Sequence, residues 1–284
     1  MPRKWVETRF GRALGRGLEY GIHESSRYVG LEHVDEINER LAEGDSALVI
    51  GNHPNSETAA MVVGETCRRF SAASEKGILA SSKFWGVGGD MGWTGDMSLM
   101  MMKEKWGMEP LMVAQDTNAH ISEDERKGIN IKMIRRTLEI LKRSGGVMWM
   151  YQEGTRCPVA LGRAQEGISM FVSEADWVLQ AVADYGKWRP GKKVEFLSPF
   201  PAAAAVTLVA DEFDVRRRDA SSMVVDYLSV RLARRLPEKR QGAYEEAVAV
   251  VEGRDPSCLP AGRRLTLGMT RWAHVPAMFW LLGE

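Results

Sequence analysis

Short apolar runs alternate along the chain with longer stretches whose apolar residues recur every three or four positions. Short runs of this kind are typical of buried strands, and the longer spacing is typical of helices. The expected strands are residues 47–51, 77–80, 110–113, 147–151, 181–183 and 194–197. The expected helices are residues 55–70, 124–143 and 164–175, and the chain turns helical and basic from about residue 211. This order indicates an α/β fold with a mixed, largely parallel central sheet flanked by helices.

The organisation of the chain favours a single domain. Its 284 residues are enough to bury a sizeable core, and no internal repeat or low-complexity linker divides them. We expect a helical segment over residues 1–29, a core over residues 30–200 and a helical part over residues 201–284. The fold thus has helical additions at both termini.

Composition narrows the function classes. Lys plus Arg and Asp plus Glu each total 38, so no net charge draws the molecule to nucleic acid. The three cysteines, Cys67, Cys157 and Cys258, form neither a disulfide framework nor a CxxC metal pair, so we expect a reducing compartment and no metal site. The first residues lack a secretory signal, and no apolar run approaches the roughly 20 residues of a spanning helix. These features predict a cytoplasmic protein.

Two of the expected strands end in reactive groups. The run at 47–51 is followed by NHPNSE, which contains His53. The run at 147–151 is followed by QEGTR, which contains Glu153 and Arg156. In open α/β sheets, ligands bind beyond the carboxyl ends of the strands. An imidazole titrates near neutral pH and can act as a base, and a guanidinium can hold a phosphate through two hydrogen bonds. The pattern predicts proton abstraction from a hydroxyl beside a bound anion.

Each of these residues also has a structural explanation. A lone histidine among turn-forming Asn, Pro and Ser residues could simply lie in a turn. The second reactive strand end makes a catalytic role for His53 the better interpretation. Arg156 could merely neutralise Glu153, but an exposed pair of that kind adds little stability, which favours contact with substrate.

The two motifs resemble those of the glycerolipid acyltransferase superfamily, which includes 1-acylglycerol-3-phosphate acyltransferases. Its members carry an NH-x4-D motif and a later [FY]-P-E-G-T-R motif. This chain has NHPNSE and, about a hundred residues later, YQEGTR. The resemblance spans roughly residues 30–198, led in by YVGLEH at residues 28–33, and a weaker similarity to a tail of some bacterial members lies at residues 236–244, LPEKRQGAY. EGTR after a strand is the more specific signal.

The resemblance implies an acyltransferase of phospholipid biosynthesis and lipid metabolism. In that family the histidine deprotonates the acceptor hydroxyl, which attacks an acyl thioester, and an aspartate orients the histidine. Carried over, His53 is the base, and the acceptor site comprises Glu153, Gly154, Thr155 and Arg156. The implied donor is acyl-CoA or acyl-carrier protein, and the implied acceptor is a lysophospholipid or a glycerol-phosphate-type hydroxyl. No cofactor beyond this co-substrate is implied.

The chain departs from the family pattern beside the base. The family's aspartate falls at Thr58, and the nearest carboxylate is Glu57, four residues after His53. In a helix this spacing places both side chains on one face, so we predict that Glu57 orients His53. The alternative is an exposed acid favoured by the helix dipole. Because Thr58 replaces the family's aspartate and Val113 replaces an arginine of the family's middle block, a catalytically weak or inactive lipid-binding relative remains an alternative. A further alternative is an acyl-thioester hydrolase, in which water replaces the acceptor alcohol.

Both ends of the chain could touch a membrane surface. Near the start, an apolar stripe with Arg and Lys residues nearby has the composition of an interfacial helix; it comprises Val6, Phe10, Leu14 and Leu18. Residues 275–282 are apolar and aromatic. Either segment could instead pack on the domain, so peripheral association with the inner face of a membrane is one of two expectations.

Overall fold

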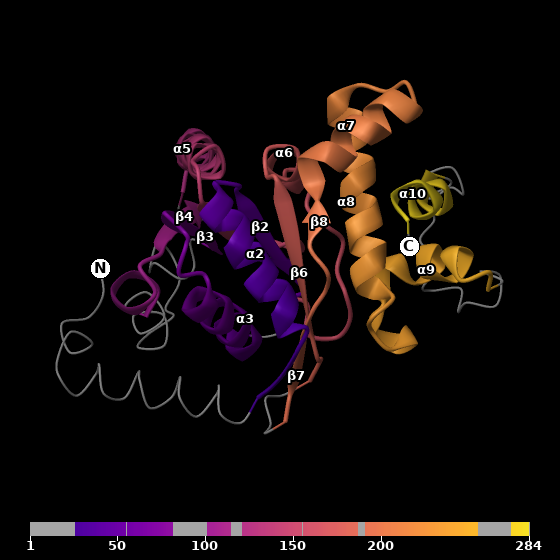
Figure 1. The fold of residues 1–284 in the computed structure, drawn as a ribbon, viewed down its shortest axis with the longest axis horizontal. Coiled ribbons are helices and arrows are strands. Elements are labelled where there is room, and N and C mark those ends of the chain that lie inside the picture. Colours follow the sequence, from indigo (N-terminus) through magenta and orange to yellow (C-terminus); the bar gives the residue numbers. More distant parts are fainter. Residues whose placement is uncertain are drawn as a thin grey trace.

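The computed structural model of the protein describes residues 26–54, 56–81, 101–114, 121–154, 156–186, 191–254 and 274–283. The side chains of residues 56–60, 81 and 101 lie outside this description. Figure 1 shows a central sheet with helices packed on both sides of it.

The sheet has eight strands in the order β1-β7-β6-β2-β5-β3-β4, with β8 beside β6. Strands β2 to β6 run parallel, whereas β7 and β8 run antiparallel to β6. The strands are β1 (Arg27–Val29), β2 (Ala47–Gly51), β3 (Glu75–Ser81), β4 (Glu109–Val113), β5 (Gly146–Tyr151), β6 (Trp177–Ala183), β7 (Lys193–Phe196) and β8 (Phe200–Pro201). The expected α/β fold with a mixed, largely parallel sheet is confirmed.

Helices cover both faces of this sheet. The α-helices are α2 (Leu31–Glu43), α3 (Ser56–Arg69), α5 (Glu123–Leu141), α6 (Ile168–Val172), α7 (Ala202–Glu212), α8 (Arg217–Ala233), α9 (Glu245–Val251) and α10 (His274–Leu282). A π-helical turn is η2 (Met101–Lys105), and two 3₁₀ turns are η3 (Glu238–Arg240) and η4 (Gly242–Tyr244). Buried residues of α2 and α3 pack into one apolar core, and those of α5 to α10 pack into the other.

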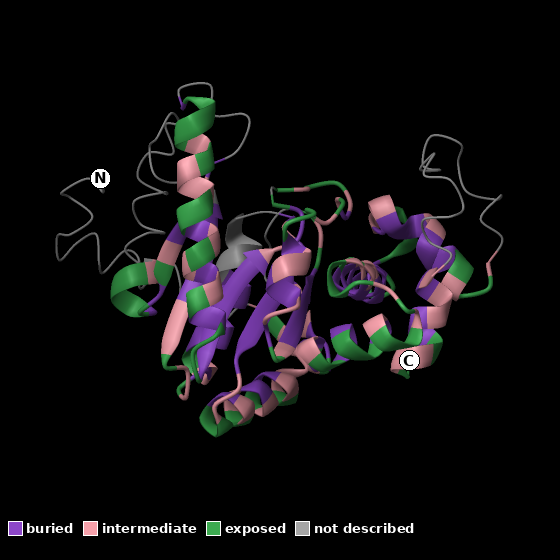
Figure 2. Cartoon of the chain, turned by 90° about the horizontal axis from the view of Figure 1, so that it is seen from above, coloured by how far each residue is buried: buried purple, intermediate pink, exposed green. Residues whose placement is uncertain are grey.

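Burial on both faces explains why the strands read as continuous apolar runs. In β2, Leu48 and Ile50 face the core of α5 to α10, while Ala47 and Val49 face the core of α2 and α3. Strand β5 alternates in the same way, and the strands in the middle of Figure 2 are almost entirely buried. A parallel strand covered on both faces needs apolar residues at every position.

Several elements differ from the sequence prediction. Residues 27–29, expected within a helical segment, form β1, which is a strand because it pairs in parallel with β7. Residues 1–25 of that segment, with its basic apolar stripe, lie outside the described residues. Helix α2 was not predicted, although Val34, Ile37 and Leu41 bury one face of it. Helix α6 is shorter than the expected 164–175, because the residues before it bond to other parts of the chain.

The apolar C-terminal segment forms α10, which packs on α8 and α9 through Val275, Met278 and Phe279. Trp280 on the same helix is 82% exposed. The segment thus packs on the protein and also presents an aromatic side chain to its surface. Within the described residues, every helix is too short or too polar to cross a bilayer.

Candidate active site

Strands β2 and β5 are immediate neighbours in the sheet, and they bring the two motifs to one edge. Their parallel register pairs Gly51 with Tyr151, so both strands end at the same level. His53 follows β2 by two residues and Glu153 follows β5 by two residues. The two residues, which are 100 positions apart in sequence, are therefore in direct contact.

The carboxylate of Glu153 binds two backbone amides. The His53 N–H donates to Oε2 at 2.6 Å, and the Gly162 N–H donates to Oε1 at 2.8 Å. The Cys157 thiol forms a third hydrogen bond to this carboxylate. The residue is only 1% exposed. Because its oxygens bind the protein's own chain, we interpret Glu153 as the group that fixes the backbone beside His53.

Burial raises the pKa of Glu153 to about 7, from an ordinary value of 4.5. The hydrogen bonds from Gly162, His53 and Cys157 favour the ionised form and lower this pKa only in part. The carboxyl thus titrates near neutral pH in the folded protein.

This raised pKa predicts a pH-dependent stability. Ionising Glu153 costs more in the folded than in the unfolded chain. The stability that the neutral carboxyl contributes is therefore fully present below about pH 4.5, and it is lost as the pH rises to about 7. The loss is of the order of 3 kcal/mol, at about 1.4 kcal/mol per pH unit. We expect the difference in free energy of unfolding between the wild type and Glu153→Gln, measured by urea titration, to change with pH. The wild-type value should fall relative to that of the variant as the pH rises from about 4.5 to about 7. A difference that stays constant with pH would contradict the raised pKa.

Three further contacts hold the His53 segment. The His53 ring stacks on Tyr151, with centroids 4.3 Å apart and an interplanar angle of 23°. The Cys157 N–H donates to the His53 carbonyl at 2.9 Å. The preceding Asn52 is fully buried and joins the end of β2 to β6, donating to the Ala183 carbonyl at 2.9 Å and accepting from its N–H at 2.8 Å. These hydrogen bonds fix the backbone on either side of His53, and the half-buried imidazole rests on the Tyr151 ring.

Residues 157–165, which we call the return loop, follow the second motif and fold back onto it. Gln165 donates from its backbone N–H to the Gln152 carbonyl at 2.8 Å and from Nε2 to the Glu153 carbonyl at 3.1 Å. A Cβ on Gly162 would lie 2.5 Å from the Cys157 sulfur. The glycine thus leaves room for the thiol beside Glu153.

The remaining predicted residues lie around this contact. Gly154 is exposed in a turn with φ of 65°, a conformation that suits glycine. Arg156 is exposed at the same turn, and Thr155 lies outside the described residues. Glu57 is the second residue of α3, but its side chain is outside the description, so its role as the group that orients His53 stays a prediction.

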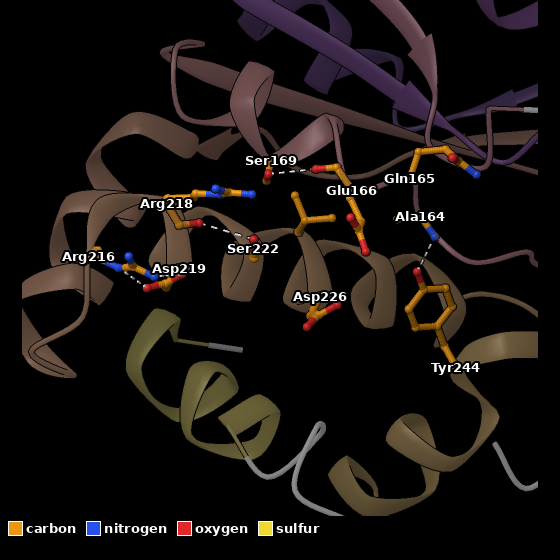
Figure 3. A pocket seen from close by; sticks show the side chains of 11 residues that line it. Ala164, Gln165, Glu166, Ser169, Arg216, Arg218, Asp219, Ser222, Asp226 and Tyr244 are labelled. Carbon is orange, nitrogen blue, oxygen red and sulfur yellow. Dashed lines mark hydrogen bonds and ion pairs between the residues drawn. The ribbon is translucent and has the colours of Figure 1, made fainter. Parts of the chain in front are cut away.

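A polar cavity of about 450 Å³ lies beside the return loop (Figure 3). It is lined by Gln165 and Tyr244, by Glu166 and Ser169, and by the first half of α8. Of the residues that the structure describes, its lining includes neither His53 nor Glu153. Asp226 in this lining lies 3.3 Å from the His274 imidazole of α10.

Sequence reasoning missed the residues that support His53. Tyr151 was read as part of a strand, and neither Cys157 nor Gly162 was assigned to the site. Their proximity in sequence to EGTR is the one available signal, since Gly162 is nine residues from Glu153. The contacts themselves join segments whose pairing only the fold determines.

Within the described part of the chain, no three His, Cys, Asp or Glu side chains are placed to hold a metal ion. Comparison with models of known families gives no match, and comparison with curated proteins gives none. The functional interpretation therefore depends on the two motifs and on the geometry that joins them.

Proposed function

We propose that the protein is an acyltransferase that moves a fatty acyl group from acyl-CoA or acyl-carrier protein to a hydroxyl of a lysophospholipid or glycerol-phosphate-type acceptor. The observation that carries this proposal is the contact between the two motifs, in which the His53 N–H donates to Glu153 at 2.6 Å. An imidazole that stacks on Tyr151 from a fixed backbone, at the carboxyl edge of a parallel sheet, suits a general base.

The proposed reaction uses His53 as that base. The imidazole takes the proton of the acceptor hydroxyl, and the oxygen forms an ester bond with the acyl carbonyl. The carbon–sulfur bond of the thioester breaks, and the leaving thiolate takes up the proton. Glu153 keeps the His53 backbone in place throughout, because its oxygens bind the amides on either side of the site.

The exposed turn after Glu153 would bind the acceptor's polar head. Gly154 and Arg156 are both exposed there, and a guanidinium suits a phosphate. Thr155 belongs to the same proposed site by its place in the motif. In this assignment Arg156 contacts the substrate, whereas the buried Glu153 holds the backbone of His53 and Gly162.

We place the protein in the cytoplasm, peripheral to the inner face of a membrane. The support is the 82% exposure of Trp280 on α10, since tryptophan is favoured at membrane interfaces. A lipid acceptor would be reached most readily from such a surface.

One assay separates transfer from its alternatives. Labelled acyl-CoA is incubated with the protein, with and without a panel of lysolipids. Labelled ester that requires an acceptor supports transfer, and free fatty acid in the absence of acceptor supports a hydrolase. Binding of acyl-CoA without any product supports an inactive lipid-binding relative.

The role of Glu57 has its own test. If its carboxylate orients His53, Glu57→Ala should lower kcat at least tenfold. Altering the orienting acid of a Ser-His-Asp triad lowers kcat by about 10⁴-fold, so tenfold is a modest expectation. Thr58→Asp in the same variant restores the family's spacing and should recover part of the loss. Turnover of Glu57→Ala at the wild-type rate would remove the role.

A further inference from the structure

The segment that follows α8 packs against the return loop. The Leu161 N–H donates to the Arg240 carbonyl at 2.9 Å, and the Ala243 N–H donates to the Leu161 carbonyl at 3.0 Å. The Ala164 N–H donates to the Tyr244 hydroxyl at 2.8 Å. Residues 240–244, which we call the clamp, thus bind the return loop at two points. They belong to the stretch LPEKRQGAY, to which the proposed reaction gives no role.

The fit between clamp and loop is closest at Gly242. This residue has φ of 57°, and a Cβ placed on it would lie 2.1 Å from the Leu161 carbonyl oxygen. Both the left-handed conformation and the close backbone approach require glycine. The contact is therefore one of backbone against backbone, with no flexible side chain to absorb a change.

The two clamped points lie on either side of the residue that binds Glu153. Gly162 stands between Leu161 and Ala164, and its N–H donates to Glu153 Oε1 at 2.8 Å. The other oxygen of the same carboxylate accepts from the His53 N–H at 2.6 Å. A continuous series of hydrogen bonds and short backbone links thus runs from the clamp through Glu153 to His53.

A second connection passes through the Tyr244 hydroxyl, which is at the edge of the cavity in Figure 3. A hydrogen bond links this hydroxyl to that of Ser229 on α8. Ser229 in turn donates to Gln152 Oε1 at 3.4 Å. Tyr244 is 1% exposed, so inside the protein its hydroxyl connects Ala164 of the return loop, through Ser229, to Gln152 of the second motif.

We propose that the clamp is a positioning element for the His53 base, with Tyr244 and Gly242 as its positioning residues. The inference deepens the proposed function, on which its catalytic consequence rests. The clamp holds the return loop, the loop holds Glu153, and Glu153 holds the backbone of His53. The C-terminal part of the chain therefore takes part in forming a site whose motifs lie entirely in the first 156 residues.

The test is Tyr244→Phe, which removes one hydroxyl and keeps the buried ring. We expect amide hydrogen exchange at Gly162 and His53 to quicken about tenfold, the effect of losing the buried hydrogen bond that holds Ala164. Exchange at Val49 and Trp149, in the middle of β2 and β5, should stay as in the wild type. Since the Gly162 bond lowers the pKa of Glu153, that carboxyl should titrate at a higher pH in the variant by NMR.

Tyr227→Phe is the matched control. It removes a phenol hydroxyl from the same helical layer, but its 1% exposed ring packs on Phe200 and Phe279 instead of the return loop. Wild-type exchange at Gly162 and His53 is expected for this control. Gly242→Ala should give a larger effect than Tyr244→Phe, and if it fails to fold, the tyrosine variant decides.

The inference would be overturned if Tyr244→Phe showed wild-type hydrogen exchange at Gly162 and His53 and a wild-type pKa of Glu153. Exchange that quickened at Val49 and Trp149 to the same degree would also overturn it, because it would indicate general destabilisation. Neither readout requires acyl transfer, so a wild type without activity counts against the proposed function alone. If the wild type is active, kcat of Tyr244→Phe should fall about tenfold, in line with the lost hydrogen bond.

Discussion

His53→Ala is expected to lower acyl transfer by about 10²- to 10⁴-fold, the range that a positioned general base contributes. The substitution removes the imidazole but leaves the backbone N–H that donates to Glu153. The fold should therefore persist, and the loss should fall on kcat. The measurement is the initial rate of acceptor-dependent ester formation, together with the urea midpoint of unfolding.

His33→Ala serves as the matched control, because His33 lies on α2 and is part of neither motif. It should transfer acyl groups at the wild-type rate. If His53→Ala were as active as His33→Ala, the imidazole could not be the base, and the mechanism would fail.

Glu153→Ala is expected to damage both stability and activity. It leaves the amides of His53 and Gly162 without their acceptor, and each buried group left unpaired costs about 1–3 kcal/mol. Part of this cost is offset, because the variant no longer buries a carboxyl whose pKa is raised to about 7. We expect a net loss of about 2–4 kcal/mol in the free energy of unfolding near neutral pH.

The activity of Glu153→Ala should fall even under conditions where the variant is folded, because the His53 segment loses its anchor. The activity of Glu153→Gln should lie between those of the alanine variant and the wild type. Its single side-chain oxygen replaces only one of the two carboxylate oxygens that accept from the His53 and Gly162 amides. Glu166→Ala, at an exposed glutamate of the following segment, is the control and should resemble the wild type. Wild-type stability in Glu153→Ala would show that the two hydrogen bonds contribute little.

The sheet around the site could be predicted from the sequence because its signals are local. The run ALVIG forms β2 within the expected bounds, and β5 begins one residue before the expected run. Two neighbouring parallel strands place their carboxyl ends together, so the meeting of His53 and Glu153 followed from the fold class. Helix α2 was missed although Leu31, Val34, Ile37 and Leu41 recur at helical spacing, so its local signal was present in the sequence.

The support of the site could not be predicted, because it depends on contacts between distant segments. The expected helix at 164–175 loses its first turn, since Gln165 binds the Gln152 and Glu153 carbonyls instead of continuing a helix. The hydrogen bond from Ala164 to Tyr244 joins residues 80 positions apart. Glu153 was expected to bind substrate, and only its burial and its two amide donors indicate that it supports the base.

The most direct test of the central claim is the number of labelled acyl esters formed per protein molecule from acyl-CoA and a lysolipid. We predict many turnovers in the wild type, product only when the acceptor is present, and a loss of about 10²-fold or more in His53→Ala. Less than one ester per molecule across the acceptor panel, with folded protein and intact donor, would contradict the claim.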